Sequence, residues 1–279
     1  MSVAPKRDFS FEFFPPRTSP GREKLRATWQ QLAQLKPRFF SVTFGAGGST
    51  RQGTLDIALE IRAAGHEAAP HISCVASTRA EVASQLELYR KHGIRHIVAL
   101  RGDLPSGLAA SGEFRYASEL VGFIRETTGD WFRIEVACYP EYHPQTRNAA
   151  DEIRNFKRKI DAGANGAITQ YFYTAAAYFR FVDDCRAAGI ELPIVPGVMP
   201  VGNFSQLARF SDACGTEIPR WMRFKLESFH DDSASIRAFG LDVVTGLCDR
   251  LLAGGAPGLH FYTLNHADLT STVWQRLGL

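Results

Sequence analysis

Glu12 is the only carboxylate in an aromatic run, FSFEFFPPRT, that spans residues 9–18. If this run is a β-strand, Phe9, Phe11 and Phe13 lie on one face and Glu12 lies on the other. A carboxylate in apolar surroundings is unfavourable unless a partner stabilises it or its pKa rises. Carboxyl groups with a raised pKa commonly act as general acids. We therefore expect Glu12 to point into the core of the fold, to have a raised pKa and to donate a proton.

Polar side chains also stand within or just after other short apolar runs. Strand alternation places most of them in pairs that share one face of a strand. The pairs are Ser41 with Thr43, His71 with Ser73, Arg101 with Asp103, Glu135 with Tyr139, and His260 with Tyr262, while Gln170 stands alone. Taken singly, His71 or His260 is more typical of a core histidine. Gln170 could satisfy a backbone group, and Asp103 could cap the turn GDLPSG. Taken together, these residues predict a polar cluster inside the fold or at one end of it.

The segment NFKRK, residues 155–159, follows one of these runs and carries paired cations. Glu152, Asn155 and Lys159 recur at helical spacing, offset from the apolar residues of the same helix. Such a polar stripe is either a solvated helix face or a site for phosphates and ribose hydroxyls.

Eight short apolar runs alternate with segments of helical character. The runs span residues 9–14, 39–45, 70–75, 96–102, 133–139, 167–173, 193–199 and 259–265. They are apolar on both faces, as buried parallel strands are. Thr78 and Glu81 form a capping box where one helix should begin, and Gly93 stands where it should end. Further helices are expected around 153–160 and at 203–213, 241–252 and 267–277.

Eight strand–helix units predict an α/β fold, a single (β/α)8 TIM barrel with extra helices, whose active site lies at the carboxyl ends of the strands. A doubly wound open sheet is the alternative. No strand is followed by G-x-G-x-x-G, however, and the glycines of GAGGST at 45–50 are spaced differently. Because no linker or internal repeat is evident, residues 1–279 are expected to form one catalytic domain.

The composition argues against several classes of protein. The 32 basic and 29 acidic residues give a formal net charge of +3, which offers no case for a nucleic-acid or membrane partner. No apolar run approaches the roughly 20 residues of a transmembrane helix, and the N-terminus lacks the apolar part of a secretory signal. The five cysteines form no CxxC pair and the eight histidines no HExxH motif. We therefore expect a cytoplasmic protein without a protein-held metal.

Eight longer motifs follow one another along nearly the whole chain. They are FSFEFFPPRT, SVTFGAGGST, AAPHISCVAS, GIRHIVALRGDLP, VACYPEYHP, NFKRKIDAGANGAITQYFY, PGVMPVGNF and HFYTLN. In sequence and order they closely resemble those of the bacterial methylenetetrahydrofolate reductase family. The resemblance implies a barrel that holds FAD non-covalently and reduces 5,10-methylenetetrahydrofolate to 5-methyltetrahydrofolate with NADH or NADPH, in ping-pong order. Such an enzyme supplies methyl groups for methionine synthesis, and we also expect a homo-oligomer.

By this resemblance Glu12 is the general acid that protonates N10 of the folate, so that the bridging methylene opens to an iminium ion at N5. Asp103 is implied to stabilise that cation and to bind the pterin near the flavin. The implied folate contacts are Gln170, Gln206, Phe210, Tyr262 and His266. Helical spacing alone instead favours Phe210 as a core residue of the helix at 203–213.

The resemblance also implies a set of flavin contacts, with Arg158 and Lys159 neutralising the pyrophosphate. The full set is Thr43, Phe44, Ala46, His71, Arg101, Gly102, Asp103, Ala117, Tyr139, His143, Thr146, Glu152, Asn155, Arg158 and Lys159. Two positions depart from the common pattern, since Glu152 replaces an aspartate and His266 replaces an arginine that contacts folate. The chain ends at Leu279, so neither a C-terminal regulatory domain nor inhibition by S-adenosylmethionine is expected.

Three other functions stay open at this stage. One is another barrel flavoenzyme, of the proline-dehydrogenase type. The second is a barrel lyase or aldolase that forms a Schiff base, with Lys225 as the nearest candidate. The third is a flavin-binding accessory protein without turnover, against which the set of Glu12, Asp103 and Gln170 argues. The sequence does not distinguish NADH from NADPH, or show whether a partner subunit supplies electrons.

Overall fold

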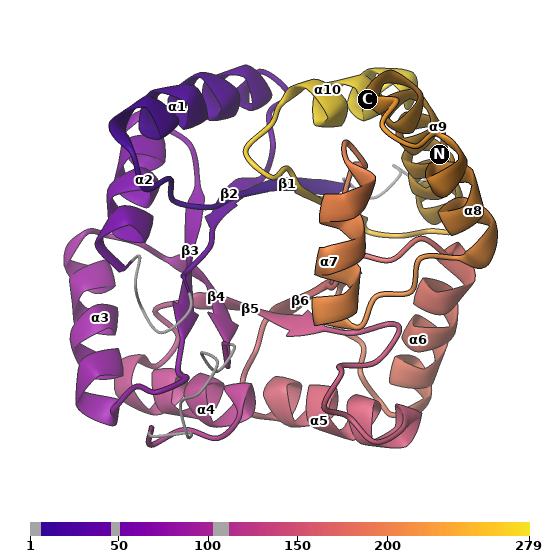
Figure 1. The fold of residues 1–279 in the computed structure, drawn as a ribbon. Helices are drawn as coiled ribbons and strands as arrows, with labels where there is room; N and C mark the ends of the chain where they lie inside the picture. The colour runs from indigo at the N-terminus through magenta and orange to yellow at the C-terminus, as the bar shows by residue number, and fades with distance from the viewer. Residues whose placement is uncertain (1–6, 46–50, 103–111) are drawn as a thin grey trace, which may run out of the picture.

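The computed structural model describes residues 7–45, 51–102 and 112–279. Parallel strands form a barrel that is surrounded by a ring of helices (Figure 1). The strands are β1 (Asp8–Phe13), β2 (Phe39–Val42), β3 (Ala68–Ser73), β4 (His96–Leu100), β5 (Arg133–Cys138), β6 (Gly166–Thr169), β7 (Ile194–Val195), β8 (Gly197–Val198) and β9 (Gly258–Tyr262). The predicted (β/α)8 architecture is confirmed.

The barrel closes through a strand that is broken at Pro196. Next to this residue, β7 pairs with β6, whereas β8 pairs with β9. Proline has no N–H to give to a ladder, so the single strand predicted at 193–199 becomes two strands of two residues each. The carbonyl of Pro196 still accepts a hydrogen bond from the His260 amide at 3.0 Å. The described strand segments therefore occupy eight positions around the barrel, in the order β7-β6-β5-β4-β3-β2-β1-β9-β8.

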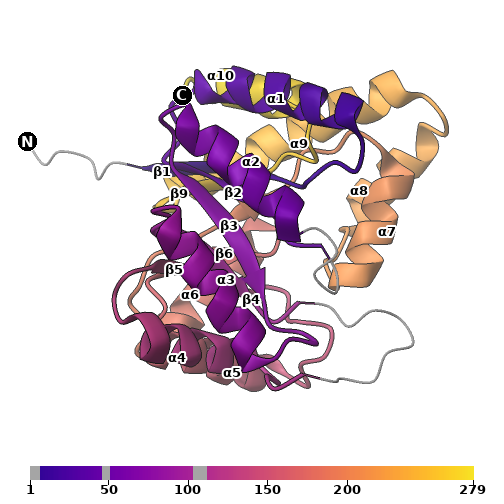
Figure 2. The ribbon, with the colours of Figure 1, turned by 90° about the vertical axis from the view of Figure 1, so that its left-hand side faces the viewer.

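The helices of the described residues follow the strands in the expected alternation. They are α1 (Ser19–Ala33), α2 (Arg51–Ala63), α3 (Arg79–Lys91), α4 (Ala117–Thr128), α5 (Ala149–Asp161), α6 (Ala175–Ala187), α7 (Phe204–Cys214), α8 (Arg220–Ser228), α9 (Ser233–Ala253) and α10 (Asp268–Arg276). The predicted capping box begins α3, where Thr78 Oγ1 accepts from the Glu81 amide at 3.2 Å. The sequence pattern did not single out α8. Figure 2 shows α7 on the side toward which the strands point.

The phenylalanine face of β1 packs under the helices, as predicted. Phe11 and Phe13 are at most 1% exposed. The ring centroid of Phe11 lies 5.9 Å from that of Trp274 in α10, and Phe9 lies 4.7 Å from the same indole. Phe13 stacks on Phe40 of β2 at 5.6 Å. Burying a phenylalanine contributes about 1.5–3 kcal/mol, so these contacts strongly favour the orientation in which Glu12 faces the barrel interior.

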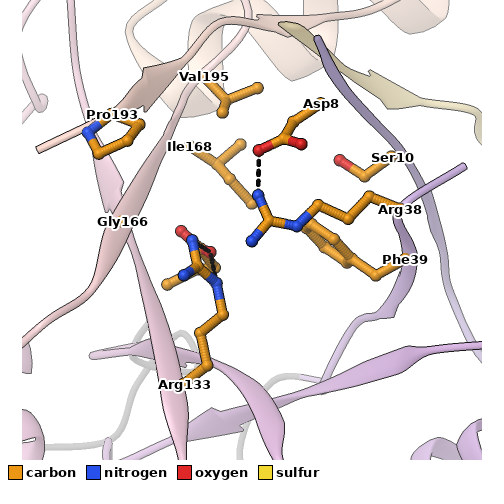
Figure 3. A pocket seen from close by; sticks show the side chains of 10 residues that line it. Asp8, Ser10, Arg38, Phe39, Arg133, Gly166, Ile168, Pro193 and Val195 are labelled. Carbon is orange, nitrogen blue, oxygen red and sulfur yellow. Dashed lines mark hydrogen bonds and ion pairs between the residues drawn. The ribbon is translucent and has the colours of Figure 1, made fainter. Parts of the chain in front are cut away.

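Charged side chains close the amino-terminal end of the barrel (Figure 3). Arg38 forms an ion pair with Asp8. Arg133 donates to Glu135 Oε1 at 2.9 Å, and the same oxygen lies 3.3 Å from His96 Nε2. Burial raises the pKa of Glu135, but His96 and Arg133 together lower it by more. A small cavity of about 10 Å³ lies among these groups.

Gly197 makes closure of the barrel sensitive to a single methyl group. A Cβ at this position would lie 2.2 Å from the Thr169 carbonyl oxygen of β6 and 2.5 Å from the Tyr262 ring of β9. We expect Gly197→Ala to lower the free energy of unfolding in urea by about 1–3 kcal/mol, the usual effect of overpacking. Gly122→Ala, in α4 with no atom within 4 Å of the new Cβ, should raise it by about 0.5–1 kcal/mol. Equal stability of the two variants would contradict this account of closure.

Candidate active site

Glu12 lies inside the barrel near the carboxyl end of β1, where three neighbouring strands supply its partners. The Ser41 hydroxyl of β2 donates to Glu12 Oε2 at 3.2 Å. The same oxygen lies 3.2 Å from His71 Nε2 of β3 and 3.4 Å from His260 Nε2 of β9. Strand register explains two of these contacts, because Glu12 is paired with Ser41 in β2 and His260 is paired with Ser10, on the same face of β1 as Glu12. The Glu12 side chain is 16% exposed, so it is not completely sealed from solvent.

The two histidines are held differently. His260 is fully buried, and its Nδ1 lies 2.7 Å from the Ser10 hydroxyl, while its Nε2 meets Glu12. Both ring nitrogens of His260 therefore have protein partners. His71 Nε2 is buried and has no well-aligned hydrogen bond among the described residues, so its contact with Glu12 is mainly one of charge. His71 thus has a ring nitrogen that can turn to a ligand.

The pKa of Glu12 is lowered, not raised. Burial by itself raises this pKa, as the sequence suggested. The charge of His71, together with the hydrogen bond and the charge of His260, lowers it by more, and the resulting pKa lies well below the ordinary value of 4.5. The expectation of a raised pKa is therefore wrong, because the aromatic neighbours were visible in the sequence and the histidine partners were not. The free protein holds Glu12 as a carboxylate among imidazole groups.

Arg101 and Gly102 follow β4 and line the wall beside His71. Gly102 has a φ of +85°, and a Cβ on it would lie 2.0 Å from the Ser73 hydroxyl, so only glycine fits here. That hydroxyl donates to the Arg101 carbonyl at 2.8 Å, which holds the end of β4 against β3. The Arg101 guanidinium donates to Gln145 Oε1 at 2.6 Å. A cation is thereby placed between the β4 and β5 loops.

Glu152 organises the loop between β5 and α5. It is 2% exposed, and its Oε2 accepts from the Thr146 hydroxyl at 2.8 Å and from the His143 amide at 3.2 Å. The His143 ring meets the Tyr139 ring edge-on at 4.8 Å. Glu152 therefore has a structural role in placing Tyr139, His143 and Thr146.

The paired cations of α5 point in different directions. Lys159 is partly buried and donates to the Ala137 carbonyl of β5 at 2.5 Å. Burial lowers the pKa of Lys159, and nearby Glu152 partly offsets that effect. Arg158 is exposed and donates to Asn155 Oδ1 at 3.3 Å. The stripe predicted from NFKRK therefore joins a buried cation to a solvated one.

Gln170 and Tyr262 lie on the wall opposite His71. Tyr262 donates its hydroxyl to the Thr169 carbonyl at 2.8 Å, and burial raises the pKa of this phenol. Gln170 follows β6, and its Oε1 accepts from the Tyr171 amide at 3.0 Å. The Gln170 side-chain N–H group has no such bond among the described contacts, which leaves an amide donor at the mouth.

Gln206 and Phe210 stand one turn apart on α7. Phe210 is 38% exposed, so the interpretation of this residue as part of the helix core is wrong. An exposed aromatic ring on the helix that lies beyond the strand ends is suited to stacking on a ligand. His266, just after β9, is also exposed.

The remaining predicted site residues divide into two groups. Thr43 and Phe44 directly follow β2, and Ala117 begins α4. The Arg51 guanidinium lies 5.8 Å from the centroid of the Phe44 ring. Ala46 and Asp103 lie outside the described residues, so their predicted roles stay predictions.

Three other residues change the sequence-based picture. His260 is a partner of Glu12 that is absent from the predicted site residues, although its alternation with Tyr262 indicated that it points inward. Glu135 does face the interior, but at the amino-terminal end, four residues below Tyr139 in β5. Lys225, the Schiff-base candidate, is exposed on α8 over the ring of Phe229.

No group of three or more histidine, cysteine, aspartate or glutamate side chains in the described part of the chain is arranged to hold a metal ion. No helix in the described ranges combines the length and apolar character needed to cross a membrane.

Comparisons with known proteins show the family and the fold of the chain. A sequence model described as methylenetetrahydrofolate reductase matches residues 2–278. The 5,10-methylenetetrahydrofolate reductases of Salmonella typhimurium and Escherichia coli are each 43% identical over 272 residues, which cover 97% of this chain and 90% of theirs. An Arabidopsis thaliana relative, methylenetetrahydrofolate reductase (NADH) 1, is 38% identical, and the match covers 48% of its length.

A solved structure from Clostridium thermocellum shares the fold, with a TM-score of 0.63 and 16% identity. The alignment covers 99% of this chain and 96% of that one. That protein is described as binding two copies of 5-methyl-5,6,7,8-tetrahydrofolic acid.

The electrostatic setting of Glu12 predicts how it responds to loss of a histidine. His71→Gln removes the foremost of the influences that lower its pKa, so we expect that pKa to rise toward the ordinary value of 4.5. Carbon-13 NMR of labelled glutamate carboxyls, with the Glu12 signal assigned by Glu12→Gln, measures the change. His92→Gln, at an exposed position, should leave the signal unaltered. A Glu12 pKa that is the same in both histidine variants would show that imidazole charge does not set its ionisation.

Proposed function

Because the chain belongs to the methylenetetrahydrofolate reductase family, we propose that it reduces 5,10-methylenetetrahydrofolate to 5-methyltetrahydrofolate with a bound FAD, which NADH or NADPH reduces first. The observation that carries the proposal is an inward carboxylate, Glu12, at the carboxyl end of the barrel and within reach of two imidazoles. That is a proton-handling group at the end of the fold where barrel enzymes act.

The residues around the mouth suit a flavin dinucleotide. Arg101 and Lys159 supply cations for phosphates, and Tyr139, His143 and Thr146 supply aromatic and hydroxyl groups for a ring system and a ribose. The buried Nε2 of His71, without an aligned hydrogen bond among the described residues, is a polar atom that such a ligand would satisfy. When bound, FAD would accept hydride from the nicotinamide and deliver it to the methylene carbon of the folate.

The contribution of the chain itself is positioning and proton transfer. We assign to Glu12 the proton that N10 takes as its bond to the bridging carbon breaks. Ser41 and the two histidines fix the carboxyl group in one orientation, which keeps the acid in place before the substrate arrives. Gln170 and Gln206 offer amide groups to the pterin, and the exposed Phe210 ring offers a stacking surface.

Two aspects of the proposal concern a residue that departs from the family pattern and the cellular role of the protein. His266 replaces the arginine common in the family, so the folate contact at this position would be made by an exposed imidazole or lost. Methyl supply for methionine synthesis, a cytoplasmic location and a homo-oligomeric state stay predictions from the sequence.

An absorbance spectrum of the purified protein followed by anaerobic titration tests the proposal. Bound flavin should bleach on addition of NADH or NADPH, and added 5,10-methylenetetrahydrofolate should restore its absorbance. Flavin that bleaches but is not reoxidised by the folate would favour another barrel flavoenzyme. A colourless protein that borohydride links to a carbonyl substrate would favour the lyase.

Glu12→Gln should separate the two half-reactions. We expect reduction of the flavin by NADH to proceed at nearly the normal rate, because no proton is needed from residue 12. Reduction of the folate should fall by about 10²–10⁴, the usual effect of removing a general acid. Stopped-flow absorbance of the flavin measures both steps. Glu60→Gln, which changes an outer carboxylate paired with Arg26, is the matched control. Equal loss of both half-reactions in Glu12→Gln would contradict the assignment of Glu12 as the general acid.

A further inference from the structure

We propose that Ser10 and His260 deliver protons to Glu12 from the amino-terminal end of the barrel, opposite to the mouth where the ligands bind. The inference rests on the proposed function, in which Glu12 gives up one proton in each turnover. Neither residue would touch the substrate, since both act through Glu12.

A continuous chain of polar atoms links the two ends of the barrel. The Ser10 hydroxyl lies 2.7 Å from His260 Nδ1, and His260 Nε2 lies 3.4 Å from Glu12 Oε2. Ser10 and Glu12 stand two residues apart on β1, so they share the inward face of that strand. His260 is paired with Ser10 in the neighbouring β9, which places its ring beside both.

The lower end of this chain opens on the cavity of Figure 3. Ser10 lines that cavity together with Asp8, Arg38 and Arg133. The volume of about 10 Å³ is near the smallest that holds one water molecule, and the polar side chains among its lining residues provide partners for one. The side chains of Asp8, Arg38 and Arg133 are 32%, 39% and 37% exposed, so the cavity lies next to solvent.

The buried part of the path has no other route to water along these contacts. Ser10 is 2% exposed and His260 is fully buried. On the side of the mouth, His260 Nε2 meets the Glu12 carboxyl, which folate and flavin would cover. A route from below could therefore restore the proton while the mouth is occupied.

The transfer balances without any other reactant. When Glu12 has given its proton to N10, its carboxylate takes the Nε2 proton of His260. The Ser10 hydroxyl gives its own proton to Nδ1 and takes one from the cavity water, and solvent next to the cavity supplies a proton to the hydroxide that remains. His260 gains at Nδ1 the proton that it gives up at Nε2, so the transfer leaves its charge unchanged. When the ligands leave, water at the mouth restores the Nε2 proton as the Nδ1 proton returns to Ser10.

The other polar groups around Glu12 arrive from different strands. Ser41 of β2 and His71 of β3 both meet Oε2, and Tyr262 of β9 is bound to the Thr169 carbonyl. Among the contacts described here, only His260 continues to a residue that lines the lower cavity. His71 is the other imidazole that could donate a proton to Glu12, and it lies at the mouth of the barrel.

Solvent exchange of the His260 ring proton tests the path directly. The measurement uses the flavin-loaded protein with nitrogen-15 in its histidine rings, and His260→Gln assigns the signal. We expect Ser10→Ala to slow exchange about tenfold, equal to a barrier higher by about 1.4 kcal/mol. Ser10→Thr, which keeps a hydroxyl, should restore it. If Ser10 were merely structural, loss of its hydrogen bond would leave exchange unchanged or accelerate it, and either result would overturn the proposal.

In the same exchange experiment, Glu12→Gln tests whether protons reach His260 from the mouth or from the amino-terminal end of the barrel. The proposal requires that this variant exchange its His260 proton at nearly the normal rate. Slower exchange in Glu12→Gln than in Ser10→Ala would mean that protons come from the mouth, which contradicts the proposal. Ser10→Cys, of similar size but with a weaker donor, should also slow exchange and serves if Ser10→Ala does not fold.

Stopped-flow kinetics connect the path to catalysis. Ser10→Ala should slow repeated reduction of methylenetetrahydrofolate and leave reduction of the flavin by NADH unaltered, with Ser10→Thr again restoring the rate. Failure of the wild-type protein to reduce the folate at all would refute the proposed function instead. The exchange measurement does not depend on that outcome, so the two failures are distinguishable.

Discussion

The carboxylate of Glu12 between two imidazoles is the interaction on which the chemistry of this barrel depends. Burial opposes ionisation of Glu12, and the charges of His71 and His260 favour it by more. The packing of Phe11 and Phe13 beneath the helices leaves the carboxyl no other direction in which to point. Aromatic packing outside the barrel and an acid–imidazole cluster inside it are thus two consequences of one strand.

The two ends of the barrel each place a glutamate beside histidine, but the two clusters serve different purposes. At the amino-terminal end, Glu135 meets His96 and is further bound by Arg133, and its side chain is 6% exposed. At the mouth, Glu12 meets two histidines but no arginine, and its side chain is 16% exposed. An arginine does not lose its proton at any ordinary pH, so it fixes Glu135 as a carboxylate. The imidazole rings of His71 and His260 can each give and accept a proton, so the Glu12 cluster can pass protons on.

Much of this arrangement could be predicted from the sequence, because strand alternation is a local property. It correctly separated the phenylalanines from Glu12, and the order of strands and helices gave the barrel. The pKa of Glu12 could not be obtained in this way, since His260 stands 248 residues further along the chain and meets it only after the barrel closes. Pro196 could have signalled the broken strand, but the apolar run around it dominated the pattern. Phe210 was misjudged from helical spacing because that spacing does not tell which side of α7 faces a neighbour.

The low pKa of Glu12 creates a conflict between folding and catalysis. A carboxyl whose pKa is lower in the folded than in the unfolded protein stabilises the fold above its unfolded pKa, near 4.5, and that stabilisation is lost as the pH falls through the folded value. At neutral pH the fold therefore favours the ionised form, whereas donation to N10 requires the protonated one. A ligand that covers the mouth removes water from Glu12 and shifts the balance toward the neutral acid. The proton for that change must already be within reach, and the imidazoles that make the carboxylate stable are also the nearest groups able to supply it.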